Sequence, residues 1–125
     1  MLFTREIDYA VRTLNVLKSG NKYSVKMICD TEKVPEAFAY KILKKMQRAR
    51  IIKITRGVHG GYQLIKDLNE LTLHDVVLAI EPDFVLTRCM KCTNRKTSKF
   101  QAELHNLQDL IVDRLEEVTV KNLVD

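Results

Sequence analysis

The sequence predicts a mainly α-helical chain with one small β-hairpin. Apolar residues recur at helical spacing through most of its 125 residues. The exception is IIKITRGVHGGYQLI, residues 51–65, where three of the four glycines lie between two short apolar runs. The length and a hydrophobic fraction of 46% suit one domain with a small core.

The sequence also indicates the cellular compartment of the protein. No apolar run approaches the roughly 20 residues needed to cross a bilayer. The N-terminal MLFTREIDYAV carries charges where a signal peptide has its apolar segment. Three cysteines, an odd number, argue against a disulfide framework and for a reducing compartment. We therefore expect a cytoplasmic protein that does not insert into a membrane.

Three helices are predicted in the first fifty residues. Residues 4–19 form the first, with Thr4 as its N-cap and Gly20 just past its end. A short helix capped by Ser24 follows, and Pro35 suits the first turn of a third helix because its missing N–H would be unpaired there. Two helices joined by about four residues, as the second and third are, make a helix-turn-helix. The apolar stripe of the third helix is Phe38, Ile42, Leu43 and Met46.

The outer side of the third helix belongs to the most basic third of the chain. Residues 33–66 hold nine Lys and Arg against one acid, a local charge of +8, so the remainder carries −3 of the total of +5. A surface that binds a polyanion requires such a concentration of charge, whereas general solubility does not. The alternative is a solvated basic face without a partner.

Residues 51–55 and 62–65 are predicted to be two strands around a glycine-rich tip. A hairpin directly after a helix-turn-helix is a wing. The glycines of the tip permit positive φ and remove the Cβ atoms that would hold the backbone away from a phosphate chain. Arg56 could then enter a narrow minor groove, where the negative potential is strongest. The alternative is a loose hairpin with an incidental arginine.

Beyond the wing, the sequence predicts a helix, a loop and a longer helix. Thr72 and Asp75 form a capping box at the start of LTLHDVVLAIEP, and Pro82 ends that helix. An irregular, basic loop with two cysteines follows. The long helix has an acidic outer face and an apolar stripe too long for one small core, so it is expected to pair with a second copy. The stripe is Phe100, Leu104, Leu107, Ile111, Leu115 and Val118.

The order of these motifs resembles one family. DYAVRTL in the first helix, RGVHGGYQL in the wing, LTLHDVVLAIEP, the cysteines and VTVKNLV are similar to the Rrf2 family of bacterial winged-helix regulators. That family includes iron–sulfur-cluster regulators, nitric-oxide-sensing repressors and cysteine-metabolism repressors. The resemblance covers nearly the whole chain. It implies a homodimer that binds an imperfect palindrome in double-stranded DNA and represses transcription.

The resemblance also divides the chain into functional parts. Residues 1–82 would be a winged helix-turn-helix DNA-binding domain with the wing at 51–66. Residues 83–99 would be a cysteine-bearing sensor loop, and residues 100–125 a dimerisation helix with a short closing helix.

The resemblance places Ala37 and Tyr40 at base edges and matches Arg56 to the wing arginine. Tyr40 departs from the glutamate that some members carry, so the operator sequence cannot be transferred. Charge and helical facing, independently of the resemblance, indicate that Lys41, Lys44 and Lys45 contact phosphates. The full predicted DNA-binding set is Ala37, Tyr40, Lys41, Lys44, Lys45, Arg56, Gly57, His59 and Gly60.

The ligand set that the resemblance implies for the sensor loop is incomplete. Cluster-binding members have three cysteines there, whereas RCMKCTNRKTSKF has Cys89 and Cys92, with Ser98 at the third position. Asp8 matches the position from which some nitric-oxide sensors supply a carboxylate across the dimer. Its plainer interpretation is an ion pair with Arg12, four residues along the same helix. An iron–sulfur cluster of the 2Fe–2S or 4Fe–4S type needs four ligands, mostly thiolates. Cys89, Cys92 and Asp8 leave one position open, to be filled by Ser98, His105 or a small molecule.

Several interpretations of the loop stay open at this point. Cys89 and Cys92 could ligate a cluster, act as a C-x-x-C thiol switch or bind another metal, or have no sensing role. The predicted function is a dimeric repressor whose DNA affinity responds to redox, iron–sulfur or nitric-oxide chemistry in this loop. Alternatives are regulation by a partner protein or by thiol oxidation without a cluster and, more distantly, a C-x-x-C thiol oxidoreductase. No catalytic set of residues favours an enzyme. Cys29 is predicted to be a buried small hydrophobic residue.

Overall fold

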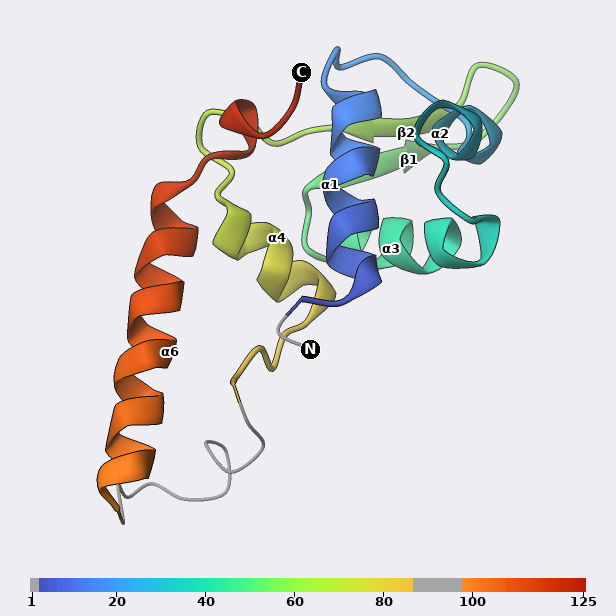
Figure 1. Ribbon diagram of the computed structural model, residues 1–125. Coiled ribbons are helices and arrows are strands. Elements are labelled where there is room, and N and C mark those ends of the chain that lie inside the picture. The colour runs from blue at the N-terminus through green and yellow to red at the C-terminus, as the bar shows by residue number, and fades with distance from the viewer. Residues whose placement is uncertain (1–2, 87–97) are drawn as a thin grey trace.

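The computed structural model describes residues 3–86 and 98–125, and it confirms a mainly helical chain with a two-stranded hairpin (Figure 1). Helix α1 crosses the hairpin and contacts α3 and α4, whereas α6 lies at the far edge of the molecule beside α4. The elements in chain order are α1 (Arg5–Leu17), α2 (Val25–Glu32), α3 (Glu36–Arg48), β1 (Ile52–Thr55), β2 (Gly61–Leu64), α4 (Leu73–Ile80), α6 (Lys99–Glu117) and a 3₁₀ turn (Val120–Asn122).

The start of α1 differs from the prediction in its capping chemistry. Thr4 is at the N-cap position with an extended backbone, but its side chain makes no cap hydrogen bond. The N–H of Ile7 instead donates to the Thr4 backbone carbonyl at 3.2 Å. Within the described part of the chain, the Thr4 hydroxyl is buried without a hydrogen-bond partner. The backbone bond therefore replaces the side-chain cap that the sequence suggested.

The helix-turn-helix forms as predicted, with small shifts at its boundaries. The Ser24 hydroxyl accepts a hydrogen bond from the Met27 N–H at 3.2 Å and caps α2. Lys33 ends α2 with a left-handed φ of 56°, which turns the chain toward α3. Pro35 is the N-cap of α3 rather than a residue of its first turn.

The hairpin is attached to the rest of the domain through β2. Its antiparallel register pairs Ile52 with Leu64 and Thr55 with Gly61. Tyr62 also exchanges two backbone hydrogen bonds with Tyr23, at 2.8 and 2.9 Å. This bridge fixes the part of β2 nearer the tip against Tyr23, the residue that precedes the α2 cap.

The core lies between α1, α3, α4 and the base of the hairpin. In α3 the residues Ile42, Leu43 and Met46 of the predicted stripe are fully buried, while Phe38 is half-buried and packs against Tyr9. The predicted capping box of α4 is present: the Thr72 hydroxyl accepts from the Asp75 N–H, and the Asp75 carboxylate accepts from the Thr72 N–H. Helix α4 ends at Ile80, just before Pro82.

Helix α6 is attached at two places. Near its C-terminal end, Thr119 forms a β-bridge with Thr72 at the start of α4. Near its middle, the Gln108 side-chain amide donates to the Phe84 carbonyl at 3.2 Å and accepts from the Leu86 N–H at 2.9 Å. Most of the apolar stripe remains outside the core: Leu115 is 5% exposed, whereas Phe100 is 71% exposed. No helix in the described ranges is long and apolar enough to span a membrane.

Candidate nucleic-acid interface

The outer face of α3 is exposed because the opposite face fills the core. The buried positions Ala39, Ile42, Leu43 and Met46 follow helical spacing, so the residues between them point to solvent. Ala37, Tyr40, Lys41 and Lys44 are exposed, and Lys45 is half-buried. Most of the predicted α3 contacts therefore lie on one accessible side.

The wing tip exposes Arg56, Gly57 and His59. Gly57 has a φ of 107° and open space around its Cα, as expected for a glycine at a free tip. Gly60 has another role, because a Cβ there would collide with the Thr55 backbone carbonyl. The Gly60 N–H donates to the Gly57 carbonyl at 3.0 Å and closes the turn.

Gly61 also serves the hairpin itself. A Cβ at this position would lie 2.9 Å from the Tyr23 carbonyl oxygen, and its φ is 154°. The sequence suggested that all the tip glycines make room for a phosphate chain. At positions 60 and 61, the observed reason for glycine is close backbone approach within the protein.

Helix α3 and the wing approach each other around Tyr62. Burial raises the pKa of the Tyr62 phenol, the nearby Tyr40 phenol adds to the rise, and the Arg56 guanidinium opposes it. Tyr40 of α3 and Arg56 of the wing thus both influence the titration of one side chain.

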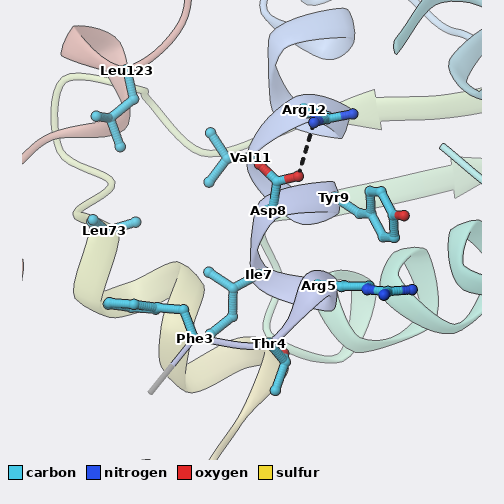
Figure 2. Close-up of a pocket in the computed structure, with 10 residues that line it drawn as sticks. All are labelled: Phe3, Thr4, Arg5, Ile7, Asp8, Tyr9, Val11, Arg12, Leu73 and Leu123. Atoms are coloured by element: carbon cyan, nitrogen blue, oxygen red, sulfur yellow. Dashed lines mark ion pairs between the residues drawn. The ribbon is translucent and has the colours of Figure 1, made fainter. Parts of the chain in front are cut away.

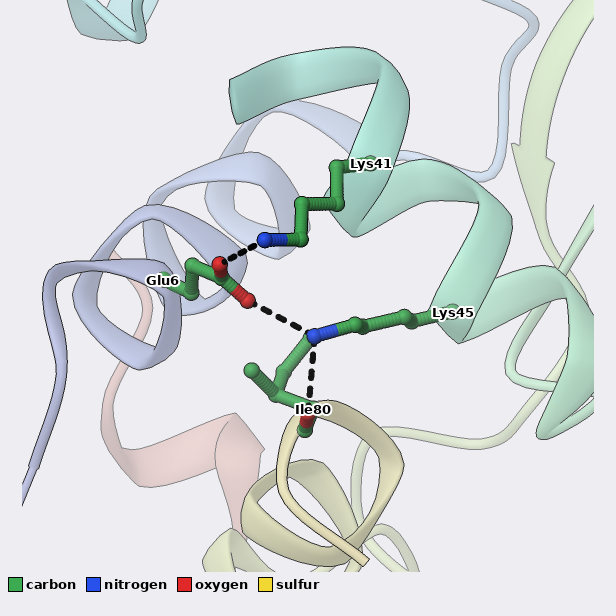
Figure 3. A network of polar contacts seen from close by, with 4 residues as sticks. All are labelled: Glu6, Lys41, Lys45 and Ile80. Atoms are coloured by element: carbon green, nitrogen blue, oxygen red, sulfur yellow. Dashed lines mark hydrogen bonds and ion pairs between the residues drawn. The ribbon is translucent and has the colours of Figure 1, made fainter. Parts of the chain in front are cut away.

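The three α3 lysines differ in their environment, and Figure 3 shows that of Lys41 and Lys45. The Glu6 carboxylate of α1 accepts from Lys41 Nζ through Oε1 and from Lys45 Nζ through Oε2, both at 2.8 Å. Lys45 Nζ also donates to the Ile80 carbonyl at 3.0 Å. In the described part of the chain Lys44, which is exposed, forms no ion pair or side-chain hydrogen bond.

These contacts favour the charged form of Glu6. The hydrogen bond from Lys41, and then that from Lys45, lowers the pKa of Glu6 despite its partial burial. Sequence reasoning did not find Glu6, because nothing local links the first turn of α1 to residues more than thirty positions away. The four-residue spacing of Lys41 and Lys45 showed only that they share a face.

Asp8 lies on another side of α1, at a cavity of about 610 Å³ between α1, α4 and the C-terminal turn (Figure 2). The Asp8 carboxylate pairs with Arg12 at 3.1 Å, and the Arg12 guanidinium carbon lies 5.8 Å from the centroid of the Tyr9 ring. This is the plain ion pair that the spacing suggested. The rest of the lining is largely apolar and includes Phe3, Ile7, Val11, Leu73 and Leu123.

The predicted cluster ligands are not assembled by the described residues. Cys89 and Cys92 lie outside them. Ser98, at the position of the third family cysteine, is the N-cap of α6 and accepts from the Gln101 N–H at 3.1 Å. Residues 3–86 and 98–125 contain no group of three or more His, Cys, Asp or Glu that could hold a metal ion. Of the three predicted ligands Cys89, Cys92 and Asp8, Asp8 lies within these ranges, and it is paired with Arg12.

Cys29 is half-buried, so the prediction of full burial is wrong. It lines a cavity of about 380 Å³ between α2 and α3, together with Val25, Asp30 and Tyr40. Ile28 is the buried residue of α2, whereas Cys29 lies beside it at this cavity and is covered only in part. Burial, and then the Glu36 and Asp30 carboxylates, raise the pKa of the Cys29 thiol, which keeps it protonated.

Comparison with known proteins decides the family. The Rrf2 family model, described as an iron-dependent transcriptional regulator, matches residues 3–125. The chain belongs to the Rrf2 family. Similar proteins include Protein aau3 of Rhizobium meliloti (strain 1021), which is 30% identical over 131 residues covering 99% of this chain and 85% of that protein. The HTH-type transcriptional regulator NsrR of Shouchella clausii is 26% identical, over 99% of this chain and 89% of that protein.

The fold is likewise found among solved structures of Rrf2 type. CymR (YrzC), the global cysteine regulator of B. subtilis, superposes with a TM-score of 0.78 at 19% identity, covering 97% of this chain and 94% of that chain. The predicted family and fold class are thus confirmed. Rrf2 proteins are transcriptional regulators and not enzymes, so the thiol oxidoreductase alternative is discarded.

Proposed function

We propose that this Rrf2 protein binds operator DNA sequence-specifically and represses transcription from it. Helix α3 lies in the major groove and the wing in the adjacent minor groove. The observation that carries the proposal is the exposure of Tyr40 and Lys44 on the outer side of α3, together with the exposure of Arg56 at the tip of the wing that follows it. These residues supply a side chain for base edges, an ammonium group for phosphate and a guanidinium group for the minor groove.

The residues on this surface have two kinds of role. Ala37 and Tyr40, three positions apart on α3, face the base edges and set sequence preference. Lys44 and the wing residues Gly57 and His59 contact phosphates, and they set affinity and its dependence on salt.

The proposal includes a homodimer formed through α6. Phe100, Leu107 and Leu110 are exposed along this helix in a single chain, and burying them needs a further apolar surface. A second copy supplies one by symmetry, because a twofold interface uses the same patch twice. A twofold protein matches an operator with two inverted half-sites.

We further propose that chemistry at Cys89 and Cys92 changes operator affinity. Their segment joins the end of α4 at Ile80 to the cap of α6 at Ser98, and so connects the DNA-binding part to the proposed dimer helix. Thiol oxidation, an iron–sulfur cluster and a bound partner protein are the candidate signals. The described residues of one chain do not complete the ligand set of a cluster. The proposal therefore does not depend on a cluster.

The central experiment is selection of duplexes by the purified protein from a random pool, followed by titration at several salt concentrations. We expect an imperfect palindrome to be enriched and log affinity to fall linearly with log salt. A pool that stays random after repeated selection would rule out sequence-specific recognition.

The sensing part needs a separate experiment. Protein purified without oxygen is examined for visible absorbance and for iron and sulfide per chain, and its operator affinity is compared with that of the oxidised form. The variant Cys89→Ser with Cys92→Ser should lose any difference between the two states. Equal affinity of the parent in both states would remove this loop from regulation.

A further inference from the structure

Glu6 and Lys45 occupy a junction of three helices. Glu6 is in the first turn of α1, Lys45 is near the end of α3, and the Ile80 carbonyl ends α4 (Figure 3). One ammonium therefore bonds to two other helices at once, at 2.8 Å and 3.0 Å. We name the Glu6 carboxylate, the Lys41 and Lys45 ammonium groups and the Ile80 carbonyl the Glu6 clamp.

The clamp differs from an ordinary surface ion pair. The Glu6 side chain is 14% exposed and the Lys45 side chain 29% exposed, so water competes weakly for both groups. Exposed ion pairs contribute little to stability, but removing one partner of a shielded pair leaves an uncompensated charge. The Lys45 ammonium also satisfies a carbonyl at a helix C-terminus, where the helix dipole favours a positive charge. Pulling Lys45 away toward DNA would break both contacts.

The clamp also restrains the rotation of α3. Lys41 and Lys45 are one turn apart on the same side of the helix, and both are bonded to one carboxylate. Two attachments along one side fix how far α3 turns about its own axis. That rotation decides where Ala37 and Tyr40 meet the bases, since they lie elsewhere on the same short helix.

We propose that Glu6 and Lys45 are positioning residues that set the placement of α3 on DNA, and that Lys45 is not a phosphate contact. This inference rests on the proposed DNA-binding function and revises the role expected for Lys45 from charge alone. The phosphate-contacting role belongs to Lys44, which faces solvent. Lys41, whose side chain is 59% exposed, keeps one contact to Glu6 and remains accessible from outside.

Lys44 and Lys45 are adjacent and carry the same charge, so their variants provide a matched test. Lys44→Gln, Lys45→Gln and Glu6→Gln are compared with the parent on the selected palindrome and on a duplex of random sequence. Affinity is measured across a range of salt, at a temperature well below the melting point of every variant. Glu70→Gln, which removes an exposed carboxylate outside the clamp, is the control for the change in net charge.

The two lysine variants should fail in opposite ways. Lys44→Gln should weaken binding to both duplexes equally and flatten the salt slope by about 0.9 per subunit. Lys45→Gln should keep the parent slope but lose about fivefold to tenfold on the palindrome, with a smaller loss on the random duplex. The ratio of specific to non-specific affinity should therefore fall only for Lys45→Gln.

The result for Glu6→Gln is the most discriminating. If the clamp positions α3, Glu6→Gln lowers the affinity ratio as Lys45→Gln does, and the double variant is no worse than either single one. If Glu6 only occupies lysines that later bind phosphate, Glu6→Gln instead raises affinity and steepens the slope, which would overturn the proposal. A fall in melting temperature with unchanged affinity, ratio and slope would overturn it as well, because the clamp would then be purely structural.

Failure of this inference can be told apart from failure of the proposed function. If Lys45→Gln flattens the slope as Lys44→Gln does while the parent binds the palindrome, only the positioning role is wrong. If the parent binds no duplex in a salt-dependent way, the DNA-binding proposal is wrong and the inference is overturned with it.

Discussion

Helices α3 and α6 have equally regular apolar stripes but opposite surroundings. The stripe of α3 is enclosed by α1, α4 and the hairpin, and Leu43 is completely buried. The stripe of α6 has α4 on one side only among the described residues, and Leu107 in the stripe is exposed, as is the neighbouring Leu110. The polar faces differ too, since that of α3 is basic and that of α6 is acidic. Periodicity therefore identifies a face that needs a partner, but not whether the partner belongs to the same chain.

The largest effect should come from the inner face of α3. Leu43→Ala removes a fully buried side chain, and we expect it to lower the free energy of unfolding by about 3 kcal/mol through lost burial and a residual cavity. Urea denaturation followed by circular dichroism measures this. The neighbouring Lys44→Ala, on the exposed face, should change it little. Equal effects of the two variants would break the contrast between the faces of α3.

Substitutions on the exposed apolar side of α6 should weaken dimerisation rather than folding of the single chain. Leu110→Glu places a charge in the proposed dimer contact and should weaken dimerisation by at least about thirtyfold, as for a central interface residue. Sedimentation across a concentration series measures it, and the helical signal should stay at the parent level. Asp109→Asn, at the adjacent exposed position, is the control. A parent that is already monomeric at all concentrations would contradict the pairing of α6 with its twin.

A substitution at the exposed wing tip should change only the affinity for DNA. Arg56→Ala at the wing tip should weaken binding to the selected palindrome by about tenfold, because a single arginine contact is lost. It should leave the urea midpoint unchanged, since Arg56 is exposed. Lys121→Ala removes the same charge from the exposed C-terminal turn and should retain parent affinity. Equal losses for both variants would mean that net charge, and not the wing, determines binding.

The smallest effect concerns pH. The pKa of Glu6 in the folded protein is below its ordinary value of 4.5, so the folded state favours the carboxylate. Glu6 therefore contributes stability that is fully present above that ordinary value and is lost as pH falls through the lower, folded value. The parent should exceed Glu6→Gln in urea midpoint at neutral pH, and the difference should shrink below about pH 4.5. A difference that stays constant on acidification would show that the charge of Glu6 does not contribute.

Most of the architecture was predictable because it depends on local signals. The Ser24 cap, the capping box of Thr72 and Asp75, and the wing register follow from residues close together in the chain. The α3 surface was predictable for the same reason, since a buried stripe determines which side is outside. Family motifs added the roles of Ala37, Tyr40 and Arg56, which remain predictions.

What the sequence could not provide depends on distant neighbours. The contact of Glu6 with Lys41 and Lys45 joins α1 to α3, and no periodic pattern encodes it. Gly60 and Gly61 looked like adaptations to a ligand because the carbonyls that they approach are known only after folding. Cys29 has helical spacing suited to the core, but it lies at the cavity between α2 and α3, which is formed only when the two helices pack.

The attachment of α6 at Gln108 has a mechanical consequence. Gln108 joins the middle of α6 to the residues that follow α4, and the first residue of α6 lies about 14 Å along the helix from it. A tilt of the N-terminal end of α6 therefore acts, through the Gln108 amide, on Phe84 and Leu86, directly downstream of α4. The long helix thus transmits a displacement of its N-terminal end to the segment next to Ile80.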